Sequence, residues 1–575
     1  MTSGQTAQRK DGSWHTFAEQ VQQAVDNLAR ALDAGGASAR DVVKLVFYPV
    51  DWSMDLAEDL VGPILRLLSE KHGAPHQPLT TLVPVPKLAY PEAKFEIEAV
   101  ALVGGTSEPW RDSKSEGYSA PPAEVDVVVV GGGFSGMAAA SRCHDAGLST
   151  VVLEAKSRIG GRSRSHHLDS GSGVVEMGAT WINKTTQPEV YALTRRFGLE
   201  TAEQYTEGDE VFQGVDGKVG PTEKDREQEQ ILASALIERP EALNIRKWHD
   251  FPAEEDVTFA EWVTEIWCTG DHAQHVANHL CSAIVGRGSD VVGAHYFLDY
   301  VKSGLGFISL ITEGEMGAQS LKVKKGMSEI AYALGRSLKP GSIWLNSPVD
   351  SIVQRHGCCH VTTTAGASFK ARKVIMANPT NTYTNIRFSP PLPSGKRALV
   401  SRTKPGHYAK VIVSYKTAWW REAGLVGKFT SFKGPICFSW DTSDPGNNQY
   451  SLAIFIAGDI AYKWHQLPSL QQEEAVVDHL AELVGRELAE NAVNVLEINV
   501  MEWTKEEHIW GAPTSAIGPK LLSKHSQELR QPFRDIHFAG GETAFEWKGY
   551  LEGAITAGYR AAEEVQQALQ PETKL

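Results

Sequence analysis

Along the first hundred residues, the spacing of apolar positions alternates between the period of a helix and the period of a strand. Val25 and Leu28 belong to a stripe with helical spacing, whereas in 95–103 apolar residues alternate with Glu96 and Glu98, as on a half-buried strand. The expected elements are a helix at 17–34, a strand at 42–48, a helix at 56–68, and strands at 80–85 and 95–103. The pattern predicts a small α+β domain over residues 1–104.

This periodicity stops in the stretch 105–123, where Gly, Ser, Pro and charged residues dominate, and we interpret the stretch as a linker. The apolar run Val125–Val130 then suits a buried parallel strand. A helix at 135–146 and a second strand at 148–153 follow, and Glu154 ends that strand. The order strand, turn, helix, strand predicts a Rossmann-type α/β unit.

Between this strand and helix lies a glycine pattern, Gly131-x-Gly133-x-x-Gly136, with Ser135 at the helix start. The first glycine allows a tight turn, the second lets the backbone approach a pyrophosphate, and the third permits close packing of helix on strand. The helix N-terminus adds N–H groups, and Glu154 is placed to accept from ribose hydroxyls. The sequence therefore predicts a dinucleotide site.

The run from Glu154 and Ala155 to Arg162 carries a second glycine pair, Gly160-Gly161, beside an arginine. An NAD enzyme does not need this second clamp on the diphosphate, so FAD is favoured. From here the chain resembles the flavin-containing amine oxidase superfamily. The matching motifs are GGGFSG at 131–136, EAKSRIGGR at 154–162, VVEMGATWI at 174–182, FSPPLP at 388–393 and FAGGETAFEWKGYLEGAITAG at 538–558.

The resemblance implies roles for further residues and a division of the chain. The implied FAD contacts are Glu154 at the ribose, Gly161 and Arg162 at the diphosphate, Gly178, Ala179 and Thr180 near the flavin, Val349 at adenine, and Gly541, Glu542 and Leu551 over the ribityl chain and flavin. The implied FAD-binding segments are 124–198, 311–393 and 501–570, and the implied α+β substrate segments are 199–310 and 394–500. The tryptophans expected over the flavin are Trp419, Trp420, Trp440 and Trp464, beside Trp181.

The resemblance also concerns the catalytic centre. Membrane-bound members link the flavin to a cysteine, and Ala512 stands at that position, so FAD is expected without a covalent bond. The family's aromatic cage matches Tyr550 on one side, whereas the opposite position holds Pro513, so the second wall is either missing or supplied from elsewhere, for instance by Trp510. The lysine that holds a water against the flavin matches Lys322, and the open alternative is that this lysine-rich run is a solvated face.

The first domain resembles the RidA/YjgF imine-deaminase family through Ser3-Gly4-Gln5, the stretch 23–36, the run 41–44 and the closing 95–101. It starts later than family members, without room for their first hairpin. The family's substrate-binding arginine should follow Pro78, where the sequence has Leu79-Thr80-Thr81-Leu82. We therefore expect a structural or assembly domain that has lost catalysis.

Composition limits the classes of partner that the chain is expected to bind. With 56 Lys and Arg against 70 Asp and Glu, the chain of 575 residues carries a net charge of −14, which gives no broad attraction to nucleic acid or anionic membranes. Six scattered cysteines indicate a reducing compartment. No metal site is expected, because His272, His275 and His279 lack a matching carboxylate pattern. The partners expected are a small amine and O2, and a homo-oligomer stays open.

The fused arrangement resembles fungal aminopolyol amine oxidases that act on fumonisin-type toxins, through FLDYVKSGLG at 297–306, PGSIWLNSPV at 340–349, WWREAG at 419–424 and WGAPTSAIG at 510–518. This implies oxidative deamination of a long-chain primary amine. A polyamine or monoamine oxidase, a non-catalytic flavoprotein scaffold and an amino-acid oxidase remain alternatives. A cytoplasmic location is expected, with a peroxisomal one as the alternative because the chain ends in Thr573-Lys574-Leu575.

Overall fold

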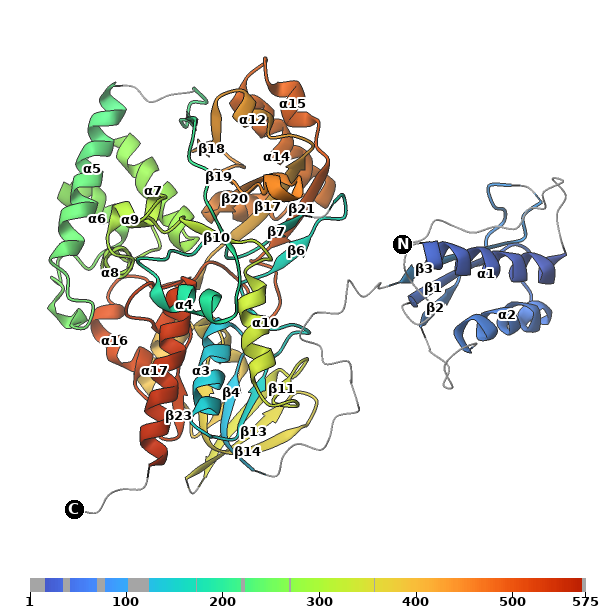
Figure 1. Cartoon of the computed structure of the whole chain (residues 1–575), viewed down its shortest axis with the longest axis horizontal. Coiled ribbons are helices and arrows are strands. Elements are labelled where there is room, and N and C mark those ends of the chain that lie inside the picture. Colours follow the sequence, from blue (N-terminus) through green and yellow to red (C-terminus); the bar gives the residue numbers. More distant parts are fainter. Residues whose placement is uncertain are drawn as a thin grey trace. The chain divides into compact units, whose positions relative to one another are not determined.

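A computed structural model of the chain describes residues 16–34, 42–69, 78–90, 92–101, 124–171, 173–218, 223–267, 270–355 and 357–570. The chain divides into two compact units, 1–113 and 114–575, and the division falls inside the predicted linker (Figure 1). The linker itself, the Ser3-Gly4-Gln5 motif and the terminal Thr573-Lys574-Leu575 lie outside the described residues.

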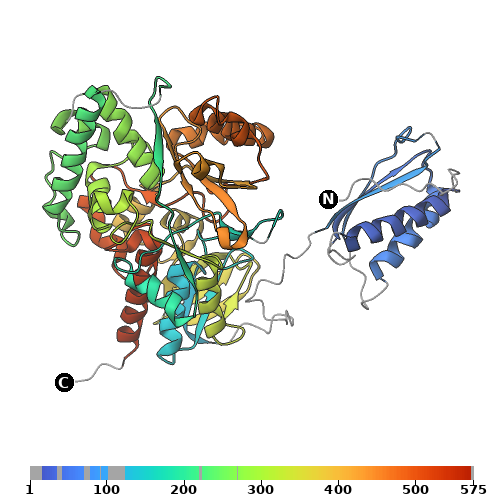
Figure 2. The same ribbon diagram turned by 45° about the horizontal axis from the view of Figure 1, so that its top comes forward.

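In the first unit, two helices cover one face of a three-stranded sheet with the order β2-β1-β3 (Figure 2). Its elements are α1 (Phe17–Ala34), β1 (Val42–Pro49), α2 (Ala57–Ser69), β2 (Leu79–Leu82) and β3 (Phe95–Ala101). Leu28 packs with Phe95 and Ile97 in the core, while Glu96 and Glu98 stay outside it, as the alternation predicted. The strand β2 is shorter than predicted, and all four of its residues are exposed.

The second unit contains an eight-stranded sheet with the order β11-β5-β4-β14-β13-β12-β15, and β23 also pairs with β14. Its strands are β4 (Val125–Val130), β5 (Thr150–Leu153), β11 (Ile343–Trp344), β12 (Val349–Arg355), β13 (Cys358–Thr363), β14 (Ser368–Met376), β15 (Arg387–Ser389) and β23 (Ile536–Phe538). The strand β4 lies parallel to both β5 and β14, buried as its apolar run predicted.

Three helices belong with this sheet: α3 (Phe134–Asp145), α10 (Ser328–Ser337) and α17 (Leu551–Leu569). Long α17 runs beside α3 (Figure 1), and the two come close because Gly558 of α17 lies against the backbone of Ser135. The predicted order of strand, turn, helix and strand over 125–153 is thus observed, with helix and strand ends displaced by one or two residues.

A second, six-stranded sheet has the order β21-β17-β20-β19-β18-β9. Its strands are β9 (Asp209–Gln213), β17 (Tyr408–Tyr415), β18 (Leu425–Ser431), β19 (Phe438–Asp441), β20 (Tyr450–Ala457) and β21 (Glu497–Glu502). One face packs on α12 (Trp419–Glu422), α13 (Gly458–Trp464), α14 (Ser469–Val484) and α15 (Ala489–Val493), in a core that also buries Trp419, Trp420 and Trp464. Those three tryptophans therefore stabilise this core rather than lie beside Trp181.

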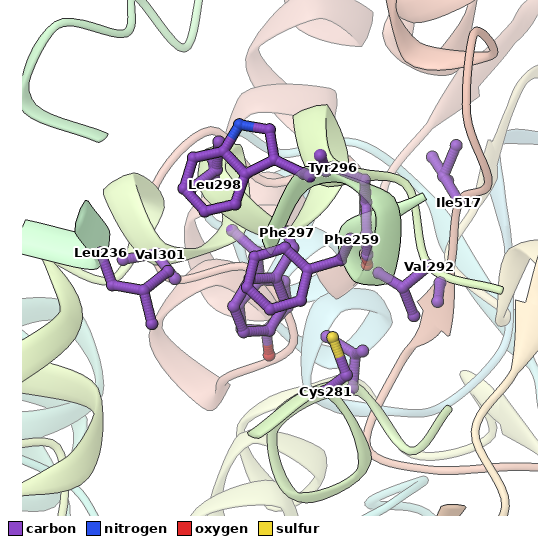
Figure 3. Close-up of a cluster of buried hydrophobic side chains, with 14 of the residues drawn as sticks. Leu236, Phe259, Cys281, Val292, Tyr296, Phe297, Leu298, Val301 and Ile517 are labelled. Carbon is purple, nitrogen blue, oxygen red and sulfur yellow. The ribbon is translucent and has the colours of Figure 1, made fainter. Parts of the chain in front are cut away.

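A helical lobe stands beside this sheet in Figure 1, made of α5 (Glu223–Glu241), α6 (Phe259–Trp262), α7 (Asp271–Val285), α8 (Ala294–Ser303) and α9 (Phe307–Ile311). Figure 3 shows its core, where Phe259 and Phe297 pack 4.3 Å apart between ring centroids. The remaining elements are α4 (Pro188–Arg196), α11 (Ser394–Arg402), α16 (Leu522–Arg530), β6 (Ser165–His167), β7 (Val174–Glu176), β8 (Thr201–Glu203), β10 (Leu321–Val323), β16 (Lys404–Pro405) and β22 (Ser515–Ala516), with short 3-10 and π turns between them. Within the described ranges, no helix combines the length and apolarity needed to cross a membrane.

A buried carboxylate joins α4 to α17 and makes stability depend on pH. Glu552 accepts from the backbone N–H groups of Glu189 (3.1 Å) and Val190 (2.8 Å) at the start of α4. Burial nevertheless raises the pKa of Glu552 from 4.5 to about 7. The folded protein therefore binds this proton more tightly than the unfolded chain, and the stabilisation is lost as pH rises through that range.

Glu552→Gln is expected to remove this pH dependence, because glutamine still accepts a hydrogen bond but does not ionise. Relative to wild type, the variant should gain about 1–3 kcal/mol between pH 4.5 and pH 7.5. Denaturant unfolding of the FAD-loaded protein at several pH values measures the difference. An equal pH slope in both proteins would contradict the assignment.

Candidate functional site

A cavity of about 480 Å³ in the second unit is lined by residues from both sheets and from the helical lobe. Of the site residues expected from the sequence, the lining includes Gly131, Gly133, Ser135, Glu154, Ala155, Gly161, Arg162, Gly178, Ala179, Thr180, Val349, Pro513, Gly541, Tyr550 and Leu551. Gly136, Lys322, Trp510 and Glu542 do not line it. The fold thus brings most of the expected residues, far apart in sequence, around one space.

One end of the cavity is formed by the turn between β4 and α3. Gly133 caps the N-terminus of α3, so the first N–H groups of the helix face this end and favour an anion. Glu154 accepts from the N–H of Gly132 (2.6 Å) and of Lys156 (2.8 Å). A carboxylate has room for about four hydrogen bonds, so Glu154 keeps accepting capacity for hydroxyl groups.

The glycines of this turn differ in the space around them. A methyl group on Gly136 would lie 1.9 Å from the carbonyl oxygen of Gly131, so this glycine packs the helix on the strand and does not line the cavity. A methyl group on Gly133 would meet only the Cα of Gly161, at 3.8 Å. Gly133 therefore leaves space that the protein itself does not fill.

Two alanine substitutions should separate packing from ligand binding at this turn. Gly133→Ala should leave the unfolding midpoint of the ligand-free protein unchanged yet weaken FAD binding at least about tenfold, because the methyl group occupies the approach to the helix N-terminus. Gly136→Ala should lower both the unfolding midpoint and the affinity for FAD, because its methyl group collides with the backbone. Flavin titration and thermal unfolding of each variant measure the two effects, and unchanged FAD affinity in Gly133→Ala would contradict the assignment.

Arg162 joins this end of the cavity to the segment before α17. Its Nη1 donates to Glu542 (2.7 Å) and to the carbonyl oxygen of Pro513 (2.6 Å). Glu542 does not line the cavity itself but contacts Arg162, and its Oε2 is buried with no hydrogen-bond partner among the described residues. Glu542 thus orients the arginine, and its Oε2 remains available as a hydrogen-bond acceptor.

Another part of the cavity is bounded by an aromatic wall. Trp181 lies 5.4 Å from Trp440 and 6.2 Å from Phe455 between ring centroids, and Phe455 stacks on Phe438 at 4.6 Å. Of the four expected tryptophans, Trp440 is the one that lies beside Trp181 in the cavity. Such a wall is suited to an apolar chain or a neutral amine.

A buried lysine of β17 stands at the inner end of this aromatic wall. The Nζ of Lys410 donates to the carbonyl oxygen of Gly178 (3.0 Å) and to the hydroxyl of Thr180 (2.5 Å), and lies 5.0 Å from the Phe455 ring centroid. Burial lowers the pKa of Lys410 from 10.5 to about 7, although the nearby Glu176 opposes this. The uncharged form of Lys410 is therefore accessible near pH 7, and in that form the amine can exchange a proton or bind water.

The structure does not support the sequence-based choice of Lys322. This residue lies in β10, and its Nζ donates to the carbonyl oxygen of Ser443 (2.9 Å), outside the cavity. Lys410 was missed, although its sequence context gave a signal. It is the one charged residue in the strand YAKVIVSY (408–415), and a lysine buried in an apolar strand needs a specific reason.

Tyr550 lines the cavity as expected, with Trp547 at 5.1 Å and Tyr300 at 6.4 Å between ring centroids. Pro513 lines it too, but offers no aromatic ring. Trp510 does not supply one, because its backbone lies in the left-handed region (φ 50°) and its side chain packs near His508, partly exposed. The cavity therefore has an aromatic wall at Tyr550 and none at the two positions expected to oppose it.

A family model for flavin-containing amine oxidoreductases matches residues 134–566, three quarters of the chain. The chain belongs to the flavin-containing amine oxidase family. It is an FAD-dependent amine oxidase, and most of the residues that line the cavity belong to the matched region.

Relatives of this amine oxidase cover the same region. Flavin-containing amine oxidase B of Sus scrofa is 31% identical over 460 residues, spanning 78% of this chain and 87% of the relative, and the Homo sapiens protein is 30% identical over 470 residues. Among solved structures, cyclohexylamine oxidase from Brevibacterium oxydans is 27% identical with a TM-score of 0.73, covering 78% of this chain and all of that one. Putrescine oxidase bound to putrescine shares the fold, with a TM-score of 0.72 at 24% identity.

The N-terminal unit of the amine oxidase is related to a different family. A model described as endoribonuclease L-PSP, the family of the RidA proteins, matches residues 1–103. This match covers the whole first unit up to the predicted linker. The two units of the chain thus match two different families.

The residues present in the amine oxidase fit FAD. The free N–H groups of α3, the unfilled space at Gly133 and the remaining acceptors of Glu154 suit a pyrophosphate and a ribose. Val349 and Pro348 line the same end of the cavity, where an adenine would need an apolar surface.

Within the described ranges, no cluster of three or more His, Cys, Asp or Glu side chains is arranged to hold a metal ion. The half-buried ring of His279 lies 4.9 Å from that of Phe432 between centroids, and desolvation lowers the pKa of His279 to about 4.

Proposed function

We propose that this FAD-dependent oxidase deaminates a primary amine on a long hydroxylated chain, an aminopolyol of the fumonisin type. The observation that carries the proposal is the make-up of the cavity. Its inner part is aromatic, while the side chains of Thr430 and Gln319 add polar groups to the lining. Gln319 Oε1 is buried with no hydrogen-bond partner among the described residues, so it is free to accept from a hydroxyl group.

The overall reaction converts a primary amine, O2 and water into a carbonyl compound, ammonia and hydrogen peroxide. When bound, FAD supplies the acceptor for a hydride from the carbon that bears nitrogen, and then the reductant for O2. The protein must hold the amine uncharged with that C–H bond aimed at the flavin, and exclude water. Tyr550 and the Trp181 wall perform the exclusion and positioning in this proposal.

We assign to Lys410 the role that the family resemblance first gave to Lys322. Lys410 contacts Gly178 and Thr180, two residues that the resemblance places near the flavin. A neutral Lys410 at the aromatic wall accepts a proton or holds a water there. Lys322, bound to Ser443, has no path to that position.

We further propose that FAD is held without a covalent bond. Ala512 lines the cavity at the position where family members have the linking cysteine, and no cysteine is found among the described lining residues. FAD should therefore be released intact when the protein is unfolded with denaturant. Flavin that stays with the precipitated protein would contradict this.

For the first unit we propose a structural or assembly role. The expected arginine position falls on β2, where Leu79–Leu82 provide no guanidinium for a substrate carboxylate. Deletion of residues 1–104 that leaves amine turnover intact but alters assembly would support this role, and imine hydrolysis by the isolated unit would contradict it.

Peroxide release tests the main proposal. Purified protein is assayed with long-chain amino alcohols, simple alkylamines and polyamines of similar length. The highest kcat/KM is expected for the hydroxylated primary amines. A preference for spermidine would favour a polyamine oxidase, and no turnover with any amine would favour a non-catalytic flavoprotein.

A further inference from the structure

An ion-pair cluster lies at the cavity, on the side of the aromatic wall away from Lys410. The Nζ of Lys428, on β18, is 2.9 Å from Oε1 of Glu210 on β9, and it also contacts the carboxylate of Glu313, which follows α9. The same ammonium stands 4.4 Å from the Trp440 ring centroid. Lys428, Glu210 and Trp440 all line the cavity.

This cluster joins directly to the aromatic wall. The Nζ of Lys410 lies 5.8 Å from the Trp181 ring centroid, and the ring centroids of Trp181 and Trp440 are 5.4 Å apart. The Nζ of Lys428 lies over the Trp440 ring. A substrate whose reacting amine lies near Lys410 would pass Trp181 and Trp440 before its chain meets Lys428.

The cluster contains two carboxylates and one ammonium group. Lys428 and Glu313 are largely buried, with side-chain exposures of 15% and 13%, whereas Glu210 is 63% exposed at the cavity rim. Two carboxylates beside an aromatic ring are a favourable site for an ammonium group. Here that position is taken by a side chain of the protein.

We propose that Lys428 is a specificity-determining residue that excludes diamines and polyamines, because its own ammonium group occupies the site where their second ammonium group would bind. The inference rests on the proposed oxidation of primary amines. A second ammonium group on the substrate would have to displace Lys428 from Glu313 in order to bind there, whereas a neutral hydroxyl group can both donate to Glu210 and accept from Lys428. The exclusion therefore acts through occupation of the ammonium site and leaves the length of the chain free.

The test uses the FAD-loaded full chain and matched series of 1-aminoalkanes and α,ω-diaminoalkanes with equal carbon counts. In Lys428→Met the carboxylates lose their cation, so kcat/KM for the diamine of suitable length should rise about tenfold to a hundredfold relative to its monoamine. Lys428→Arg should keep the exclusion. The double variant Lys428→Met/Glu313→Gln should lose most of the gain.

Binding is measured alongside turnover, through the change in flavin absorbance on titration with each diamine. Tighter diamine binding in Lys428→Met, reversed in the double variant, supports the inference. An unchanged ratio of diamine to monoamine in both binding and kcat/KM overturns it, and Lys428→Gln repeats the test if the methionine variant loses FAD. Failure of wild type to oxidise any monoamine overturns the proposed function instead, and the binding comparison still decides the role of Lys428.

Discussion

Lys410→Met is expected to lower amine turnover about a hundredfold or more, the cost of losing one preorganised polar group at a reacting centre. Methionine is similar in length and keeps the contacts with Phe455 and Trp181, but it cannot donate to Gly178 or hold a water. The loss should appear in both steady-state peroxide release and the single-turnover rate with O2. FAD content should stay near that of wild type.

Lys322→Met is the matched control for this experiment. Both lysines are removed from strands in the same way, but the Nζ of Lys322 donates to Ser443 outside the cavity. Its loss should change turnover by less than about threefold, as expected for a group that does not touch the reacting atoms. Loss of activity in Lys322→Met with retention in Lys410→Met would restore the sequence-based assignment.

Asp299→Asn is expected to destabilise the FAD-loaded protein by about 3–5 kcal/mol, because it leaves a buried charge without its partner. Asp299 contacts the ammonium of Lys548, and the two side chains are 1% and 3% exposed. Asparagine keeps the oxygen that accepts from Nε1 of Trp248 (2.9 Å), so the change isolates the charge. Tyr550 lies two residues after Lys548, so KM for the amine should rise as well.

The double variant Asp299→Asn/Lys548→Met provides the control, because it removes both charges. It should recover most of the lost stability, since a buried pair is often replaceable by uncharged groups of similar size. Urea unfolding followed by flavin fluorescence gives the free energies. Equal destabilisation of the single and double variants would show that the unpaired charge is not the cause.

The sequence predicts the dinucleotide end of the site in the most detail, because the signal for that end is local. An apolar strand, three glycines and an acidic residue follow one another within 125–154, and each has its own steric or electrostatic reason. The structure places Gly131, Gly133 and Glu154 around one end of the cavity accordingly. Gly136 and Glu542 serve the same end indirectly, through packing and through Arg162.

The amine end could not be predicted in this way, because its residues meet only through the tertiary fold. Lys428 contacts Glu210, 218 positions away, since β9 adds to the edge of the second sheet beside β18. Choosing among lysines from a motif led to Lys322, in a run where three lysines fall within four positions. The burial that distinguishes Lys410 depends on β20 and β21, which flank β17 and come from the chain after it.

The order in which the eight-stranded sheet is assembled has a consequence for synthesis of the protein. Its strands β4 and β5 leave the ribosome early, yet β23 pairs with β14 only after residue 536, and α17 packs on α3 only after residue 551. Because synthesis adds about 5–20 residues per second, tens of seconds pass between synthesis of the glycine turn and synthesis of β23 and α17. We expect nascent chains that end before α17 to bind no FAD, so that cofactor loading follows release of the finished chain.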